Sequence, residues 1–559
     1  MNNKGWLLRI CYIAFSLFFL TAGKSGIFAP QITRGLFIGG VSFIAIIESM
    51  TDRNRAVDVV LLLMTAASTA YFILEYPNLG SRAGIVNGFD KVLGMMMITV
   101  CIETSRRKNG LTLSLIALFF FAYNIGGGLL PGILGHGGLS LGRTVGFLYT
   151  SLFGIYGSVA GIFSTYVFMF VLFGAVLRMT GGAEFFTQLP YLVTGKSKTG
   201  SAKSAVIASA LMGSVTGSAV ANVMTTGTFT IPLMKKAGFE SHEAAAIETA
   251  ASTGGQLMPP VMGAGAFVMA ELTGVPYSRI ILVSVAPALL YFISIYIMID
   301  MKKERSSRVG IDRKQVVDLV KGGWHHFIPL AMIFFLLIKG HSPVFASFWS
   351  IMAAIAANLI FSREKIGLRN IMDSLEDCGK NIAFIGTTAG AIGIIIGTVY
   401  LTGLGFKFSS LILGASMGIL PLMIFFVALA SYVLGMGLTV TSSYIILAVL
   451  AAPAFVDKGV SVLGAHMIIF WLSQDANITP PVCLAAYAAA GIAGANPLRT
   501  GVAALKYAKI IYVVPLLIVY TPLIDGSPVE IIILSSASIL LIFVVHKLYN
   551  IIKIKRKTA

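Results

Sequence analysis

Charged residues are scarce in this chain of 559 residues: Asp, Glu, Lys and Arg together make up 11%, whereas hydrophobic residues make up 57%. The mean hydropathy is +0.87. This composition excludes a soluble domain and indicates a polytopic membrane protein. The chain also lacks any hydrophilic stretch long enough for a folded extramembrane domain. We therefore expect an all-α fold whose function is performed within the bilayer or at its rims.

Cysteine is scarce as well, and Cys11, Cys101, Cys378 and Cys483 form no CxxC pair, so disulfides and a zinc site are poorly supported. Enzyme motifs are also missing. Residues 194–197 read TGKS, but the first glycine of a phosphate-binding loop would fall at Pro190. No HExxH or GxSxG motif stands out. We expect neither an ATPase nor another enzyme, and no bound cofactor.

Acidic residues are outnumbered, with 23 Asp and Glu against 41 Lys and Arg and a net charge of +18. The basic residues gather in short connections at residues 106–108, 196–203, 302–314 and 553–557. This distribution is typical of cytoplasmic loops under the positive-inside rule and predicts a cytoplasmic C-terminus. The runs are too short, and too poor in aromatic residues, for a nucleic-acid partner.

Long apolar runs are abundant. Segments of spanning length recur at residues 6–20, 59–73, 111–122, 280–299, 344–361, 510–522 and 531–545. The first run follows Lys4 and Arg9 as in a signal peptide, but without a convincing cleavage site it is interpreted as a first span. Residues 1–125 are predicted to form a block of about four spans. A glycine-rich junction at residues 126–138 separates this block from the remainder, 126–559.

Within residues 126–559, two stretches share the same pattern of helix-breaking and polar residues. Residues 252–260 read STGGQLMPP and residues 473–481 read SQDANITPP. Further matches occur at the same spacing: Pro232 with Pro453, Gly238 with Gly459, Val261 with Val482, and Pro276 with Pro497. A duplicated helix that is broken by prolines and carries polar residues within apolar sequence favours a secondary transporter.

The positions of the basic loops predict that the two repeats, at about residues 195–300 and 405–525, are inverted. The broken helix near Gly255 then runs outward, and its counterpart near Asp475 runs toward the cytoplasm. A re-entrant helical hairpin precedes each broken helix. The hairpin tips are predicted within residues 213–222 and 435–443, where glycine allows a tight reversal and Ser, Thr and Asn supply oxygens.

Two hairpin tips and two breaks define the predicted substrate- and cation-binding set. Its members are Ser214, Gly217, Ser218, Asn222, Ser252, Thr253, Gly254, Gly255, Gln256, Gly435, Gly437, Thr439, Thr441, Ser442, Asp475, Asn477 and Thr479. Na⁺ is expected near Ser218, Gly255, Thr441, Asp475 and Asn477. Opened helices expose carbonyls to cations, and half-helix N-termini attract anions. Small residues spaced as Gly213 and Gly217 can equally serve helix packing.

Two buried carboxylates stand out. Asp475 lies in the middle of apolar sequence, where a carboxylate must face protein, water or a cation. It is interpreted as a Na⁺ or proton ligand, with a helix-capping role as the alternative. Glu248 occupies a comparable depth in the first repeat but has a better helical context, which favours a structural role.

Histidine and arginine offer weaker candidates. His136 and Arg143 flank the glycine-rich junction and could meet an anionic substrate or lie at a solvated rim. His325 and His326 begin a span, where an interfacial position is simpler than a metal site.

Residues 132–157, 208–236, 250–272 and 473–494 resemble the fused membrane permease of tripartite ATP-independent periplasmic (TRAP) transporters, and most closely its TAXI subgroup. The similarity extends over about residues 130–505. Residues 1–125 are similar to the small membrane subunit in position and number of spans. The resemblance implies an elevator-type carrier of the ion-transporter superfamily in the inner membrane, driven by Na⁺. It also implies a TAXI-type periplasmic binding protein that delivers a small organic anion, often a carboxylate.

The sequence therefore predicts the permease of a Na⁺-coupled uptake system. Two alternatives remain open at this point. A stand-alone symporter of the same superfamily would need no binding protein, and an ion channel could also be built from hairpins and broken helices. The inverted duplication favours a carrier, because a channel does not need to present one site to both faces.

Overall fold

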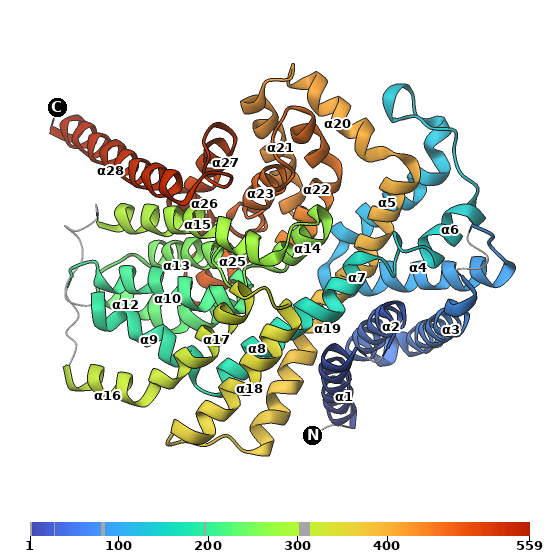
Figure 1. The fold of residues 1–559 in the computed structure, drawn as a ribbon, viewed down its shortest axis with the longest axis horizontal. Helices are drawn as coiled ribbons and strands as arrows, with labels where there is room; N and C mark the ends of the chain where they lie inside the picture. Colours follow the sequence, from blue (N-terminus) through green and yellow to red (C-terminus); the bar gives the residue numbers. More distant parts are fainter. Residues whose placement is uncertain (1–2, 27, 80–83, 195–196, 301–312, 559) are drawn as a thin grey trace.

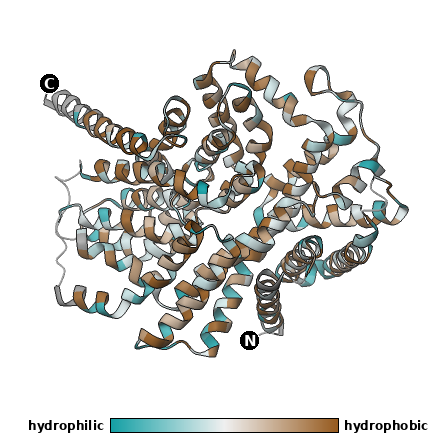
Figure 2. Cartoon of the chain, viewed as in Figure 1, coloured by the Kyte–Doolittle hydropathy of each residue, from teal (hydrophilic) through white to brown (hydrophobic). Residues whose placement is uncertain are grey.

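The computed structural model describes residues 3–26, 28–79, 84–194, 197–300 and 313–558 (Figure 1). Every regular element within these residues is a helix, and eleven helices are long and apolar enough to cross a membrane. Figure 2 shows hydrophobic residues along helices in all parts of the molecule. The four cysteines are free. The predicted all-α polytopic membrane fold is confirmed.

The N-terminal block is a group of helices that fold back on one another. They are α1 (Asn3–Ser25), α2 (Pro30–Ser49), η1 (Asp52–Asn54), α3 (Arg55–Leu79), α4 (Gly88–Asn109) and α5 (Leu111–Gly126). The candidate spans of this block contain α1, α2, η1 together with α3, and α5, whereas the more polar α4 is not among them. Asn87 and Asp90 form a reciprocal capping box that fixes the start of α4.

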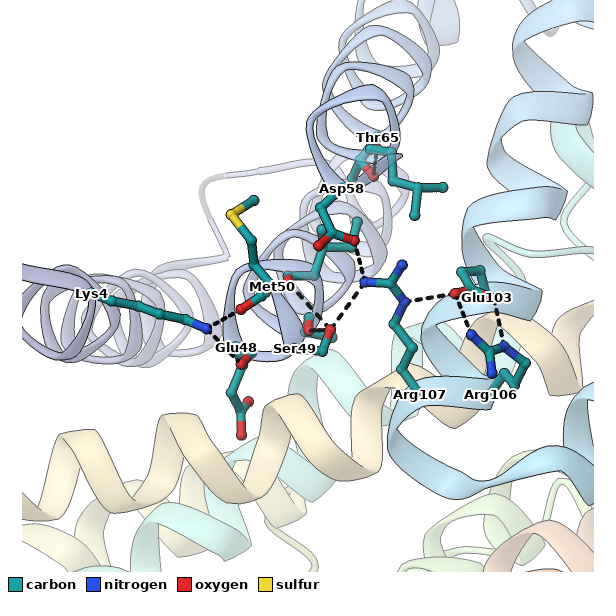
Figure 3. A network of polar contacts seen from close by, with 12 residues as sticks. Lys4, Glu48, Ser49, Met50, Asp58, Thr65, Glu103, Arg106 and Arg107 are labelled. Carbon is teal, nitrogen blue, oxygen red and sulfur yellow. Dashed lines mark hydrogen bonds and ion pairs between the residues drawn. The ribbon is translucent and has the colours of Figure 1, made fainter. Parts of the chain in front are cut away.

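Charged side chains join the helices of this block at one end (Figure 3). Arg107 on α4 pairs with Asp58 on α3 at 2.6 Å and with Glu103 at 2.7 Å. Asp58 is fully buried, so this guanidinium is its counter-charge. Lys4 on α1 donates to the backbone carbonyl oxygens of Glu48 and Met50 at the end of α2, at 3.2 and 2.5 Å.

The block packs on a long helix, α19 (Leu368–Thr402), with contacts from α1, α2, α4 and α5. Side-chain hydrogen bonds fasten it there. Asn109 donates to Thr387 at 2.8 Å, and Asn124 donates to Thr398 at 2.7 Å. The block and α19 therefore form a continuous packed unit.

The glycine-rich junction contains η2 (Gly127–Leu129), η3 (Gly132–Leu134) and then α6 (Leu141–Thr150). His136 organises it, since its Nε2 lies 3.0 Å from the Tyr123 carbonyl oxygen and its ring packs edge-on against Tyr123. The chain is irregular in this region, as the glycines predicted.

The first repeat and the helices that lead into it run in chain order as α7 (Ser158–Ile162), η4 (Phe163–Val167), α8 (Phe168–Met179), α9 (Gly182–Thr194), α10 (Gly200–Thr216), α11 (Ala219–Asn222), η5 (Val223–Gly227), α12 (Thr228–Lys236), α13 (Ser241–Gly255), α14 (Ala264–Thr273) and α15 (Tyr277–Asp300). Here α10 packs against α12 as a helical hairpin, and the α13–α14 pair is the broken helix.

The second repeat follows α19 with α20 (Leu404–Ala415), α21 (Leu420–Gly435), α22 (Val440–Asp457), α23 (Val462–Leu472), α24 (Asp475–Ile478), α25 (Leu484–Ala493), α26 (Pro497–Ala508) and α27 (Ile510–Tyr520). The hairpin is α21–α22, and the break lies between α23 and α25. Pro232 lies inside α12 and Pro453 inside α22. The helices directly before the two hairpins, α9 and α20, also lie at equivalent positions in the two repeats.

The remaining helices connect and extend the repeats. They are α16 (Arg313–Gly323), η7 (Trp324–His326), α17 (Phe327–Ile338) and α18 (Pro343–Phe361) between the repeats, and α28 (Pro528–Thr558) at the end. In Figure 1, α28 projects from the upper left of the fold. Most of the basic connection at residues 302–314 lies outside the described residues.

Candidate functional site

Each hairpin turns at a residue that caps the following helix. Gly217 ends α10 in the left-handed conformation (φ 62°), which glycine adopts without steric cost. The next residue, Ser218, accepts a hydrogen bond from the backbone N–H of Ala221. In the second hairpin, Thr439 accepts one from the N–H of Ser442. Ser218 and Thr439 lie at the repeat spacing, so both tips are where the sequence predicted them and are built alike.

The two broken helices also share unusual backbone. The prolyl bonds Pro259–Pro260 and Pro480–Pro481 are both cis. Met262 and Cys483, again at the repeat spacing, have positive φ angles of 61° and 28°. Left-handed backbone is costly for these side chains and persists only where the surroundings impose it. The breaks are therefore shaped by the fold on both sides of the duplication.

The two breaks meet through an amide pair. Asn477 Nδ2 donates to Gln256 Oε1 at 2.6 Å, and these positions are 221 residues apart, the repeat spacing itself. Gln256 Nε2 in turn donates to the carbonyl oxygen of Gly217 at 3.0 Å. One hydrogen-bonded chain thus joins the first hairpin tip, the first break and the second break at the centre of the duplication.

A cavity of about 610 Å³ opens beside this amide pair. One part of its lining, the first wall, belongs to the hairpins and breaks, and the other part, the second wall, belongs to α8 and α19. Candidate residues on the first wall are Gly217, Ser218, Gln256, Thr439, Thr441 and Asn477. On the second wall lie Phe170, Val171, Gly174, Arg178, Asp377, Asn381, Phe384, Ile385 and Thr388.

Other members of the predicted set lie outside the cavity lining. They are Ser214, Asn222, Ser252, Thr253, Gly254, Gly255, Gly435, Gly437, Ser442, Asp475 and Thr479. Several glycines among them serve close packing. A Cβ on Gly213 or Gly255 would overlap the other glycine, and one on Gly437 would overlap Thr112 of α5. The packing role weighed for small residues is thus realised at these positions.

Asp475 lies at the second break with 1% of its surface exposed. Tyr512 donates to its Oδ1 at 2.8 Å, whereas Oδ2 has no hydrogen-bond partner among the described residues. At the repeat spacing, Asp475 corresponds to Gly254 and Tyr512 to Tyr291. A Cβ on Gly254 would overlap the Tyr291 ring, so only the second repeat has room for a carboxylate here.

Glu248 is held differently. It is fully buried, and Oε1 is within hydrogen-bond distance of Ser209 at 2.8 Å, Thr226 at 2.5 Å and Ser252 at 3.1 Å, while Oε2 is 2.6 Å from Thr230. These hydroxyls come from α10, η5, α12 and α13. Glu248 therefore ties the first hairpin to the first broken helix, and the geometry favours a structural role.

The histidine and arginine candidates lie elsewhere. Arg143 lines a separate cavity of about 1040 Å³, which shares no lining residue with the central one. His325 and His326 are buried within the protein, 2% and 7% exposed. Within the described part of the chain, no group of three or more His, Cys, Asp and Glu side chains could hold a metal.

Sequence reasoning missed the second wall of the cavity. Arg178 on α8 and Asp377 on α19 form an ion pair at 2.5 Å, and Asn381 donates to Asp377 at 3.1 Å. Both lie in regular helices outside the proline-broken segments on which the prediction was based. The signal that was available is Arg178 itself, a charged residue at the end of the otherwise apolar helix α8.

A duplicated hairpin and broken helix around one central cavity define a polytopic transport-type membrane fold. Residues 92–524 match the family model described as the tripartite ATP-independent periplasmic transporter, DctM component, and the chain belongs to this family. The match begins inside α4, so most of α4 and all of α5 are included.

Two related proteins agree with this family. The chain is 23% identical over 321 residues to a protein of Haemophilus influenzae described as a TRAP transporter large permease, a match that covers 56% of this chain and 74% of that one. It is 24% identical over 172 residues to the 2,3-diketo-L-gulonate TRAP transporter large permease protein YiaN of Escherichia coli, covering 29% of this chain and 39% of that one.

Among solved structures, the Alcanivorax borkumensis YdaH transporter superposes with a TM-score of 0.51 at 15% identity, covering 73% of this chain and 98% of that chain. At this identity the likeness concerns the fold alone. These relatives are transport proteins and permeases rather than enzymes.

Proposed function

We propose that this chain is the inner-membrane permease of a Na⁺-coupled uptake system that receives an organic anion from a periplasmic binding protein. A binding protein of the TAXI type and a small subunit fused at residues 1–125 belong to the same proposal. The E. coli relative is named for 2,3-diketo-L-gulonate, which carries a carboxylate. That name supports a carboxylate substrate here.

The observation that carries the proposal is the hydrogen bond between Gln256 and Asn477 at equivalent positions of the two repeats. It lies beside a single cavity that both hairpin tips line. A carrier with inverted repeats exchanges access by moving one repeat-built site relative to a support. A site centred on the contact between the repeats suits that exchange, whereas a channel has no need of it.

Oxygen atoms that suit the proposed coupling cation lie at the second break and behind the first hairpin tip. Asp475 Oδ2 is buried and without a hydrogen-bond partner among the described residues, as is Asn222 Oδ1 behind the first hairpin tip. Na⁺ is bound by carboxylate, amide, hydroxyl and carbonyl oxygens, so these orphaned atoms fit it. We assign Asp475 as a Na⁺ ligand, together with nearby backbone opened at the second break.

The N-terminal block and α19 are proposed to be the fixed support of an elevator. Their hydrogen bonds and shared packing make them one unit. Lys4, Arg106 and Arg107 lie at the same end of the block (Figure 3), which the positive-inside rule assigns to the cytoplasm. The same rule assigns the basic C-terminus to the cytoplasm.

The test is uptake into proteoliposomes that contain the purified permease, with an inward Na⁺ gradient and the binding protein encoded beside it. Candidate organic acids, 2,3-diketo-L-gulonate among them, are supplied with and without that partner. Uptake that needs both Na⁺ and the partner is the expected result. Na⁺-driven uptake without the partner would identify a stand-alone symporter, and passive flux without either would identify a channel.

A further inference from the structure

The second wall of the central cavity, formed by α8 and α19, carries one ion pair. Arg178 Nη2 lies 2.5 Å from Asp377 Oδ2, and the two side chains are 30% and 46% exposed. Asn381 Nδ2 orients the acid, donating to its Oδ1 at 3.1 Å and to its backbone carbonyl oxygen at 2.8 Å. Among the described residues that line the cavity, Arg178 is the only cation and Asp377 the only anion.

In this ion pair, Asp377 can be replaced by another carboxylate. A guanidinium offers five N–H groups in a planar fork that matches any carboxylate. An ion pair with this much exposure is only weakly stabilising. A second carboxylate that enters the cavity can therefore replace Asp377 on Arg178 at little cost. Asp377 is thus an internal stand-in for an anionic ligand.

The pair also breaks the symmetry of the duplication. At the repeat spacing, Arg178 corresponds to Val399 on α19, and Asp377 corresponds to Tyr156. Both counterparts are uncharged and buried. If the two repeats exchange roles between the two membrane faces, the wall exposed to the opposite face carries no cation. Any role of Arg178 in binding an anion is therefore limited to one face of the membrane.

The neighbours of Asp377 along α19 indicate which membrane face this is. Asp373 and Glu376 pair with Arg9 of α1 at 2.6 and 3.2 Å. Arg9 follows Lys4, which belongs to the basic end of the N-terminal block (Figure 3). Under the positive-inside rule this end is cytoplasmic. The cavity wall that holds Arg178 therefore faces the cytoplasmic exit.

We propose that Arg178 is a carboxylate-binding point on the cytoplasmic exit path and that Asp377 competes with the transported anion for it. This inference rests on the proposed function and deepens it. The guanidinium draws the anion away from the hairpin tips, and Asp377 then displaces it from the fork. Release to the cytoplasm is favoured, and rebinding of accumulated substrate is weakened.

The first test measures inhibition of uptake by substrate preloaded in the lumen. The binding protein outside selects permeases whose periplasmic face points outward, so the lumen contacts the cytoplasmic face. Asp377→Ala should lower the inhibitory lumenal concentration by about two- to fivefold, the affinity equivalent of removing an exposed ion-pair partner. Asp377→Ala with Arg178→Gln should lose that gain. Glu376→Ala, next to Asp377 but outside the cavity lining, should behave as wild type.

A second measurement does not depend on transport. The thermal unfolding of the purified full chain is followed with acetate, succinate or gluconate, and with sorbitol as an uncharged control. In Asp377→Ala, at least one carboxylate should stabilise the protein more than it stabilises wild type, and Arg178→Gln should abolish this. An unchanged response to every carboxylate, or an Asp377→Ala gain that survives Arg178→Gln, would overturn the proposal. Failed uptake with a retained Arg178-dependent shift would refute only the proposed function.

Discussion

At the scale of single residues, positions that are equivalent in the two repeats can be compared, and the residues that differ between them are informative. Gly254 and Asp475 are equivalent, as are Tyr291 and Tyr512, but only Asp475 and Tyr512 form a hydrogen bond, at 2.8 Å. Tyr291 instead donates to the Ala250 carbonyl oxygen at 2.7 Å. A buried carboxylate with one unsatisfied oxygen is costly unless it binds a cation or a proton. Under the proposed function, this asymmetry favours one carboxylate-based cation site rather than two.

Asp475→Ala should therefore abolish uptake or weaken it severely, with at least about a tenfold rise in the Na⁺ concentration needed, because a charged ligand is lost. Membrane expression should stay intact. Uptake against Na⁺ concentration measures this. Asp457→Ala is the matched control, since Asp457 lies in the same repeat and is exposed. Wild-type Na⁺ dependence in Asp475→Ala would contradict the ligand assignment.

At the scale of helices, the first hairpin reaches the first break because glycines let the backbones approach. Gly213 on α10 faces Gly255 at the end of α13, and Asn222 Nδ2 fills the space beside them while it donates to the Ser209 carbonyl oxygen at 2.9 Å. The backbone N–H of Val261 then bonds to the Ser214 carbonyl oxygen at 3.1 Å. The first hairpin and the first break are thus packed and hydrogen-bonded to each other.

Gly213→Leu should force these helices apart at a cost of roughly 1–3 kcal/mol or more, as overpacking of a tight contact does. Thermal unfolding of the detergent-solubilised protein should show a lower Tm and reduced folded yield. Gly491→Leu on α25 serves for comparison, because nothing lies within 4 Å of a Cβ there. Equal Tm values for the two variants would show that the close approach is dispensable.

At the scale of the whole molecule, the N-terminal block depends on its charged end. Arg107 is 11% exposed and is the counter-charge of the fully buried Asp58, while its neighbour Arg106 is 52% exposed and pairs only with Glu103 among the described residues. The block in turn holds α19, which forms one wall of the cavity. Loss of the buried ion pair should therefore also disturb the cavity wall that α19 forms.

Arg107→Ala should destabilise the protein by roughly 3–5 kcal/mol, because Asp58 is left buried without its partner. Arg106→Ala should change stability little. Folded yield and Tm after membrane extraction compare the two, and Asp58→Asn combined with Arg107→Ala should recover part of the loss. An Arg107→Ala protein as stable as Arg106→Ala would show that the buried pair is not needed.

The sequence by itself determined the membrane class, the duplication, and the positions of the hairpin tips and breaks. These depend on local properties, namely hydropathy over a span and the proline, glycine and hydroxyl residues that end helices. Only the tertiary structure decided which predicted residues line the cavity. Gln256 and Asn477 were matched by spacing, but their hydrogen bond needs two distant breaks to meet. Arg178 and Asp377 lie in regular helices outside the proline-broken segments, and only helix packing brings them into the lining of the same cavity as the hairpin tips.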